Sequence, residues 1–178
     1  SLYVDQWDWE QTIRREDRNL AYLKATVEKI YRALRETEAK IYADYPHITP
    51  RLPENVTFVH TEELLQQYPD LSAKEREAKV AERYGAVFLI GIGNPLSNGE
   101  PHDGRAPDYD DWITLNDDGY YGLNGDLILW DNILEIPFEL SSMGIRVSEE
   151  SLRAQLAARG CEDRLQLSFH KALVNGEL

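Results

Sequence analysis

The stretch from residue 102 to residue 112 brings charged and aromatic side chains close together in the sequence. It reads His-Asp-Gly-Arg-Ala-Pro-Asp-Tyr-Asp-Asp-Trp, so four aspartates accompany the single arginine, Arg105. One interpretation is a solvated turn, in which an exposed Arg–Asp pair contributes little to stability. The rigid proline and the rings of Tyr109 and Trp112 favour an organised site instead. Such a site could hold a small polar ligand.

Two further carboxylates occupy positions where a core favours apolar side chains. Asp126 begins an apolar run that ends at Trp130, and Glu139 stands between Phe138 and Leu140. A carboxylate inside an apolar strand is costly unless a cation or a metal ion pairs with it. If the two runs pair as antiparallel strands, Asp126 and Glu139 converge. Together they could hold one Mg²⁺ ion, which prefers oxygen ligands.

A third pair of polar residues lies near the start of the sequence. Residues 2–9 alternate as in a β-strand, which places Gln6 and Asp8 on the same face as Leu2 and Val4. Either these two side chains reach an exposed sheet edge or they point into a polar cleft. The spacing alone leaves both interpretations open.

Other signatures of catalysis or cofactor binding are missing from the sequence. The turn at residues 91–95 lacks the third glycine of a dinucleotide fingerprint and the lysine of a P-loop. The four histidines have no metal-ligand spacing with one another or with the single cysteine, Cys161. No serine lies in a nucleophile-elbow pattern, so the sequence does not propose a hydrolase triad.

Hydrophobic periodicity predicts the elements that must position these residues. Apolar residues recur at spacings of three and four from Leu20 to Ile41, which is typical of a long helix. A loop at residues 93–122, rich in Gly, Pro, Asn and Asp, is long enough to be functional or mobile. Strands joined by turns, with helices between them, indicate an α+β fold with an antiparallel sheet. Further strands are expected at 56–60, 86–92, 126–130 and 136–143. Further helices are expected from residue 61, from a capping box at Ser72–Glu75, and over 148–159 with Ser148 as the cap. Leu165, Phe169 and Leu173 form the apolar stripe of a last helix that ends near residue 176.

Length and charge limit the class of protein. The 178 residues suit one domain spanning residues 1–178. Lys and Arg total 19 against 32 Asp and Glu, a net charge of −13, which argues against a large nucleic-acid interface. No apolar stretch approaches the roughly 20 residues that a membrane helix needs, and no signal-peptide pattern opens the sequence. We therefore expect a soluble, cytoplasmic protein without nucleic-acid or membrane partners.

Several longer motifs occur in a fixed order along the whole sequence: Tyr-Val-Asp-Gln-Trp-Asp-Trp-Glu (3–10), Phe-Val-His (58–60), Gly-Ala-Val-Phe-Leu (85–89), the charged stretch at 102–112, Gly-Leu-Asn-Gly-Asp (122–126), Phe-Glu-Leu-Ser-Ser-Met-Gly-Ile-Arg-Val (138–147) and Glu-Asp-Arg-Leu (162–165). Together they closely resemble the ammonia-dependent asparagine synthetases of type A, the aspartate–ammonia ligases. The match covers the central part of that family's chain.

The resemblance implies a fold and a reaction. The expected fold is related to the catalytic core of class II aminoacyl-tRNA synthetases, an antiparallel sheet flanked by helices, usually in a homodimer. In the expected reaction, the β-carboxylate of aspartate attacks the α-phosphate of Mg-ATP and gives β-aspartyl-AMP and pyrophosphate. Ammonia then displaces AMP to give asparagine. ATP and Mg²⁺ are the cofactors that this resemblance implies.

The resemblance also implies which residues meet the substrates. Gln6 and Asp8 would hold aspartate, with Asp8 binding its ammonium group. Asp110 and Arg105 would contact aspartate or ammonia at the catalytic centre, together with Gln6. Arg146 would line the same strand toward the substrate.

A second group would meet the nucleotide. The strand at residues 3–10 resembles the part of the class II motif that carries adenine and amino-acid contacts, and Ser1 and Val4 would bind the nucleotide. Asp126 and Glu139 resemble the carboxylates that position Mg-ATP and bind the metal. Ser142 would serve both the nucleotide and the amino-acid substrate.

Alternative functions predict different behaviour. The family's chain has an N-terminal part and a glycine-rich C-terminal segment, each with an arginine that grips ATP, and neither is present in these 178 residues. A fragment or non-catalytic relative would bind nucleotide or amino acid without turnover. An aminoacyl-tRNA synthetase core would bind tRNA, against which the charge of −13 argues. A purely structural acidic domain would show no stabilisation by ligands.

Overall fold

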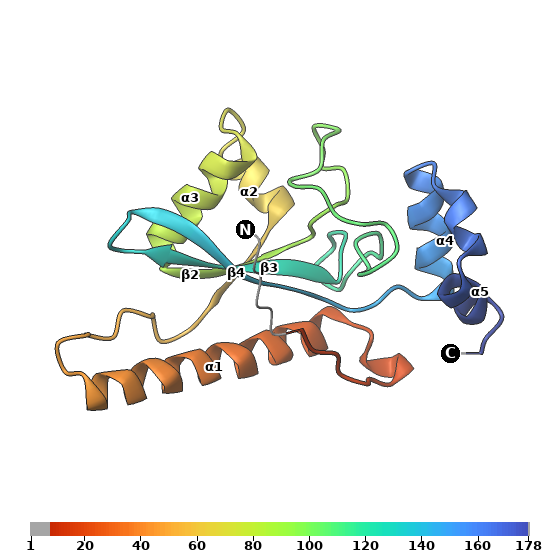
Figure 1. Ribbon diagram of the computed structural model, residues 1–178. Helices are drawn as coiled ribbons and strands as arrows, with labels where there is room; N and C mark the ends of the chain where they lie inside the picture. The colour runs from red at the N-terminus through yellow and green to blue at the C-terminus, as the bar shows by residue number, and fades with distance from the viewer. Residues whose placement is uncertain (1–7, 178) are drawn as a thin grey trace, which may run out of the picture.

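The computed structural model of the protein describes residues 8–177. A four-stranded sheet forms its middle layer, with one long helix on one face and two shorter helices on the other (Figure 1). The strand expected at residues 2–9 lies almost entirely outside the described residues, and Asp8 and Trp9 belong to no strand. The α+β class that the sequence predicts is confirmed.

The sheet has the strand order β1-β2-β3-β4. Its strands are β1 (Thr57–His60), β2 (Ala86–Ile90), β3 (Asn124–Asp131) and β4 (Ile136–Gly144). Antiparallel pairing holds for β2–β3 and β3–β4, but β1 and β2 run parallel, so the expectation of a purely antiparallel sheet is wrong. The physical reason is the crossover through two helices between β1 and β2, which returns the chain to the same end of the sheet.

The long helix α1 (Leu20–Asp44) covers one face of this sheet. Asn19 caps it by accepting a hydrogen bond from the Tyr22 amide at 2.9 Å. The predicted apolar stripe packs against β2, β3 and β4 over its first half, whereas Ile41 in the last turns is exposed. The sheet is too short to cover all of a helix of this length. A short 3-10 turn, η1 (Arg15–Asp17), precedes α1.

Helices α2 (Thr61–Gln67) and α3 (Ala73–Tyr84) cover the opposite face. The predicted capping box at the start of α3 is confirmed, since the Ser72 amide donates to Glu75 at 2.8 Å and the Ser72 hydroxyl accepts from the Glu75 amide. Among residues 8–177, no helix is both long and apolar enough to cross a lipid bilayer.

A small helical unit follows β4. It consists of α4 (Glu149–Ala158), the 3-10 turn η2 (Glu162–Gln166) and α5 (Ser168–Val174), and it has a separate apolar cluster around Leu152 and Leu156. The predicted helix at 148–159 and its Ser148 cap are confirmed. The single last helix expected from Leu165 onward is two short pieces instead. Its stripe residue Phe169 is 46 % exposed.

The long loop between β2 and β3 is ordered by hydrogen bonds to the rest of the chain. Its Asp111 amide donates to the Ile145 carbonyl at 2.8 Å, and the Val147 amide donates to the Tyr109 carbonyl at 3.1 Å. The loop is therefore tied to the segment that leaves β4. These ties bring residues 105–112 to the ends of β3 and β4.

Candidate active site

The centre of the site is Arg105, whose guanidinium lies between two carboxylates. Its Nε donates to Asp110 Oδ2 at 2.8 Å, and its Nη1 donates to Asp126 Oδ1 at 3.0 Å and to Ser142 Oγ at 3.1 Å. The Arg105 side chain is only 16 % exposed. The loop supplies Arg105 and Asp110, β3 supplies Asp126, and β4 supplies Ser142. The charged stretch is thus an organised site and not a solvated turn.

Ser142 links this centre to Glu139. Its hydroxyl lies within donating distance of Asp126 Oδ1, at 2.7 Å, and of Glu139 Oε1, at 3.1 Å. Glu139 and Ser142 are three positions apart, which in a regular strand would place them on opposite faces. A bulge corrects this, because Ser141 pairs with Leu127 while Glu139 pairs with Ile128. The predicted convergence of Asp126 and Glu139 through antiparallel pairing is confirmed.

Asp110 is fixed from the sheet side by Asn124. The Asn124 side chain donates to Asp110 Oδ2 at 3.2 Å and also bonds both backbone groups of Ile92, at 2.9 and 3.1 Å. Gly144 permits this approach: a Cβ at that position would lie 2.6 Å from the Asp110 Cβ and 2.8 Å from the Asn124 Cβ. Any larger residue would force the loop away from β4.

The charges in the site are strongly influenced by burial. Burial raises the pKa of the Asp110 carboxyl above its ordinary value, although Arg105 and Asn124 act in the other direction. Burial alone would lower the pKa of Arg105, but the carboxylates of Asp110 and Asp126 outweigh it and raise that pKa, so the guanidinium stays charged. Asp110 Oδ1 is buried and has no hydrogen-bond partner among the described residues. This oxygen can therefore accept a proton or a hydrogen bond from a ligand.

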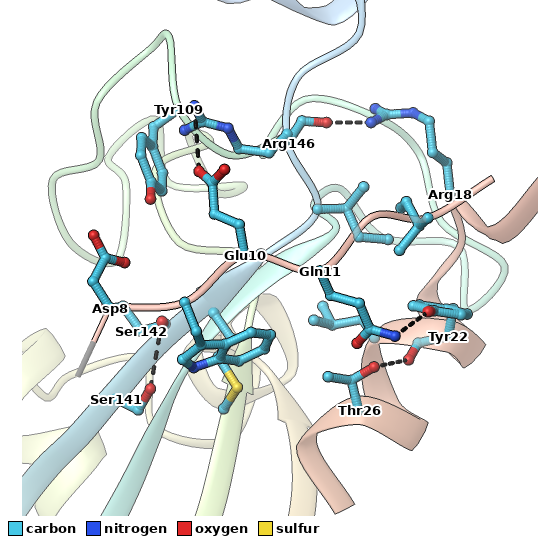
Figure 2. A pocket seen from close by; sticks show the side chains of 16 residues that line it. Asp8, Glu10, Gln11, Arg18, Tyr22, Thr26, Tyr109, Ser141, Ser142 and Arg146 are labelled. Atoms are coloured by element: carbon cyan, nitrogen blue, oxygen red, sulfur yellow. Dashed lines mark hydrogen bonds and ion pairs between the residues drawn. The ribbon is translucent and has the colours of Figure 1, made fainter. Parts of the chain in front are cut away.

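Two pockets adjoin the site. The first, of about 260 Å³, is bounded by residues 8–13, the start of α1 and the end of β4. The second, of about 240 Å³, is lined by Arg105, Asp110 and Gly144 among others. Both include Tyr109 and Ser142, so they meet at the edge of β4. In Figure 2 the segment from Asp8 to Gln11 crosses β4 beside the first pocket.

Arg146 borders the first pocket. Its guanidinium lies 3.9 Å from the centre of the Tyr109 ring and 3.7 Å from Glu10, toward which Figure 2 shows it pointing. Its Nη1 is buried without a hydrogen-bond partner among the described residues. Arg18 donates to the Arg146 carbonyl and pairs with Asp111 at 2.8 Å. This corner thus offers a cation to an anionic ligand.

The structure brings most of the residues expected from the sequence into one place. Arg105, Asp110, Asp126, Glu139 and Ser142 form the connected centre. Asp8 and Arg146 line the adjoining pocket. The expected contacts of Ser1, Val4 and Gln6 lie outside the described residues.

The oxygen ligands fit a magnesium ion that is held together with a phosphate. Within residues 8–177, no three His, Cys, Asp or Glu side chains gather closely enough to hold a metal ion by themselves. Mg²⁺ is usually held by one or two carboxylates together with substrate phosphates and water. Asp126 and Glu139, joined by the Ser142 hydroxyl, supply such a pair of carboxylates.

Three residues of the site were missed by reasoning from the sequence. Asn124 lies within a quoted motif, but its side chain gave no sign of contacting Asp110. Gly144 follows an apparently regular strand. Gln155, whose side chain bonds the backbone of Asp110, did carry a signal, because it lies between Leu152 and Leu156 on the fully buried face of α4.

The fold and the site define a class: an α+β protein with a buried guanidinium–carboxylate centre beside two small pockets. The family model described as aspartate-ammonia ligase matches residues 1–178. The chain therefore belongs to the aspartate–ammonia ligase family, whose members are ligases of asparagine biosynthesis.

Proposed function

We propose that the protein makes asparagine from aspartate and ammonia while ATP is cleaved to AMP and pyrophosphate. The observation that carries this proposal is the arrangement of Arg105, Asp110, Asp126, Glu139 and Ser142 as one bonded centre in a chain of this family. A carboxylate is a poor acceptor for ammonia, so the reaction needs an activated aspartate. We assign β-aspartyl-AMP as that intermediate.

In the first step an oxygen of the substrate β-carboxylate bonds to the α-phosphorus, and the bond from that phosphorus to pyrophosphate breaks. Asp8 and Gln6 would hold the amino acid, and Arg146 would attract one of its carboxylates. Ser1 and Val4 would lie beside the nucleotide. Asp126 and Glu139 would hold Mg²⁺, which supplies charge neutralisation on the phosphates when it is bound.

In the second step the ammonia nitrogen bonds to the acyl carbon, and AMP leaves with the electron pair of its bond to that carbon. Ammonium must first lose a proton. Asp110 suits this role because burial raises its pKa and its Oδ1 has no partner among the described residues. Arg105, bonded to the other oxygen of Asp110, holds that carboxyl in place.

The test is release of AMP and pyrophosphate by the purified protein with aspartate, ammonia and Mg-ATP. We expect release that requires both aspartate and ammonia, and a decrease of orders of magnitude in Glu139→Gln with the fold intact. Glu36→Gln, an exposed substitution on α1, is the matched control. Wild-type turnover in Glu139→Gln would remove the metal role of that carboxylate. Stabilisation by ATP or asparagine without any release would support the binding-only alternative instead.

We also propose that the protein works as a homodimer in the cytoplasm, as the family resemblance implies. Sedimentation at micromolar concentration tests the first part. A mass of one chain over the whole concentration range would contradict the dimer.

A further inference from the structure

The buried side chain of Gln155 connects α4 to the loop that carries Asp110. Gln155 is 0 % exposed. Its Oε1 accepts a hydrogen bond from the Trp112 amide at 2.8 Å, and its Nε2 donates to the carbonyls of Pro107 at 2.9 Å and of Asp110 at 3.1 Å. One side chain thus holds three backbone groups within residues 107–112.

These bonds use both donor hydrogens of the amide and its oxygen. They hold the backbone before, at and after Asp110. Asn124 holds the Asp110 side chain by a hydrogen bond, and Gly144 leaves room for it beside β4. Gln155 on α4 therefore fixes the backbone of Asp110, and Asn124 on β3 fixes its carboxylate. The distance from this carboxylate to Arg105 Nε depends on both contacts.

Other residues of the same helical unit also hold this loop. Arg159 donates to the Gly93 carbonyl at 2.9 Å, and its guanidinium lies over the Trp112 ring. Arg164 donates to both oxygens of Asp108 at 3.0 Å. Among these contacts, only that of Gln155 reaches the backbone of Asp110.

We propose that Gln155 is a positioning residue for the ligase reaction, acting through the backbone of residues 107–112 to set the contact of Asp110 with Arg105 and ammonia. This inference rests on the proposed function. It assigns no direct contact between Gln155 and substrate.

The first test is the kinetics of Gln155→Met, which keeps the length of the side chain and removes its hydrogen bonds. A misplacement of about 1 Å costs on the order of 100-fold in rate. We expect a loss of that size in kcat/KM for ammonia, with KM for ATP unchanged, because Glu139 and the Asp126–Ser142 contact lie on the strands.

The pH profile separates positioning from general destabilisation. Burial raises the pKa of Asp110, so a loosened loop that admits water lowers this pKa toward its ordinary value. The acidic limb of the ammonia-dependent rate therefore moves to lower pH in Gln155→Met. Leu152→Ala weakens the packing of the same helix but keeps the hydrogen bonds of Gln155 to residues 107–112. It should lower the melting temperature and leave the acidic limb of the pH profile unchanged.

A second measurement does not depend on turnover. In NMR spectra we expect the Arg105 Nε–H and the Trp112 amide to exchange at least about tenfold faster in Gln155→Met, since opening frees both from their partners. Gln155→Glu, which keeps the acceptor for the Trp112 amide, replaces the methionine variant if that one does not fold. It should speed exchange at Arg105 more than at Trp112.

The outcomes distinguish this inference from the proposed function. An inactive wild type would contradict the function, yet the exchange at Arg105 would still decide whether Gln155 positions Asp110. Wild-type exchange at Arg105 in folded Gln155→Met overturns the inference whatever the activity. The inference is also overturned if Gln155→Met is active with unchanged kinetics and the acidic limb of its pH profile does not move.

Discussion

Asp110 and Asp111 are neighbours in the sequence and both are buried, yet their carboxylates have different surroundings. Asp111 accepts from the amides of Ile113 and Thr114 and from the Thr114 hydroxyl, and it pairs with Arg18 at 2.8 Å. Asp110 has Arg105 and Asn124 on one oxygen, and no partner for the other among the described residues. Asp111 thus has hydrogen-bond donors on both carboxylate oxygens, whereas Asp110 has one oxygen that can still accept a hydrogen bond.

The difference teaches that burial and charge do not by themselves identify a functional carboxylate. A saturated carboxylate stabilises its loop, because every lone pair that water would satisfy has a protein donor. An undersaturated one is retained at an energetic cost and can accept a ligand or a proton. We therefore assign Asp111 to the structure of the loop and Asp110 to the reaction.

The largest expected effect is that of Asp110→Asn on activity. Because an amide cannot accept the proton of ammonium, we expect turnover to fall on the order of 1,000-fold, within the range for loss of a general base. The free energy of unfolding should fall by less than in Asp111→Asn, because Arg105 keeps its contact with Asp126 and the asparagine oxygen can still accept from Arg105 and Asn124. Turnover assays and chemical denaturation check both parts. Asp117→Asn, an exposed substitution in the same loop, is the control.

The next effect should be on stability and not on turnover. Asp111→Asn leaves the largely buried Arg18 without its carboxylate, and breaking a pair of this kind costs on the order of 3 kcal/mol. We expect the free energy of unfolding to drop by about that amount, while the folded fraction keeps its turnover within a few-fold. A folded Asp111→Asn with a 1,000-fold lower turnover would show that the two carboxylates act together and would break the comparison.

Much of the sheet side of this comparison could be predicted from the sequence. Periodicity located α1 and the strands, and the expected antiparallel pairing of 126–130 with 136–143 placed Asp126 near Glu139. The bulge at Leu140, which turns Glu139 to the face of Ser142, could not be predicted. Its cause is packing between strands, and alternation within one strand contains no information about it.

The contacts of the loop at residues 102–112 were harder to predict from the sequence. The residue types of 102–112 identified a site, but the difference between Asp110 and Asp111 depends on Asn124, Arg18 and Gln155. These partners lie between 14 and 93 residues away along the chain. Contacts of such separation follow from the tertiary fold, whereas propensity and spacing describe neighbours.

A smaller effect is expected from Gly144→Ala, which sharpens the comparison without changing any charge. The new methyl group would meet the Asp110 Cβ at 2.6 Å, and overpacking of this kind costs roughly 1–3 kcal/mol. Asp110 should be displaced from Arg105, and turnover should fall more than tenfold. The Arg18–Asp111 pair on the other side of the loop should be unaffected. Hydrogen exchange of the Thr114 amide, which donates a hydrogen bond to Asp111, measures whether that side of the loop stays intact. Faster exchange of this amide in Gly144→Ala would contradict a local effect.

The smallest effect is on the pH dependence of stability. Since burial raises the pKa of Asp110 in the folded state, the folded protein binds more protons than the unfolded chain between the ordinary aspartate pKa and the raised one. Stability contributed by the protonated form is present at low pH and is lost as pH rises through that window. Asp110→Asn lacks this loss, so its free energy of unfolding should gain on the wild type as pH rises. If the difference in free energy of unfolding between the two proteins stays constant with pH, Asp110 titrates alike in the folded and unfolded states. Burial would then not desolvate its unpaired oxygen.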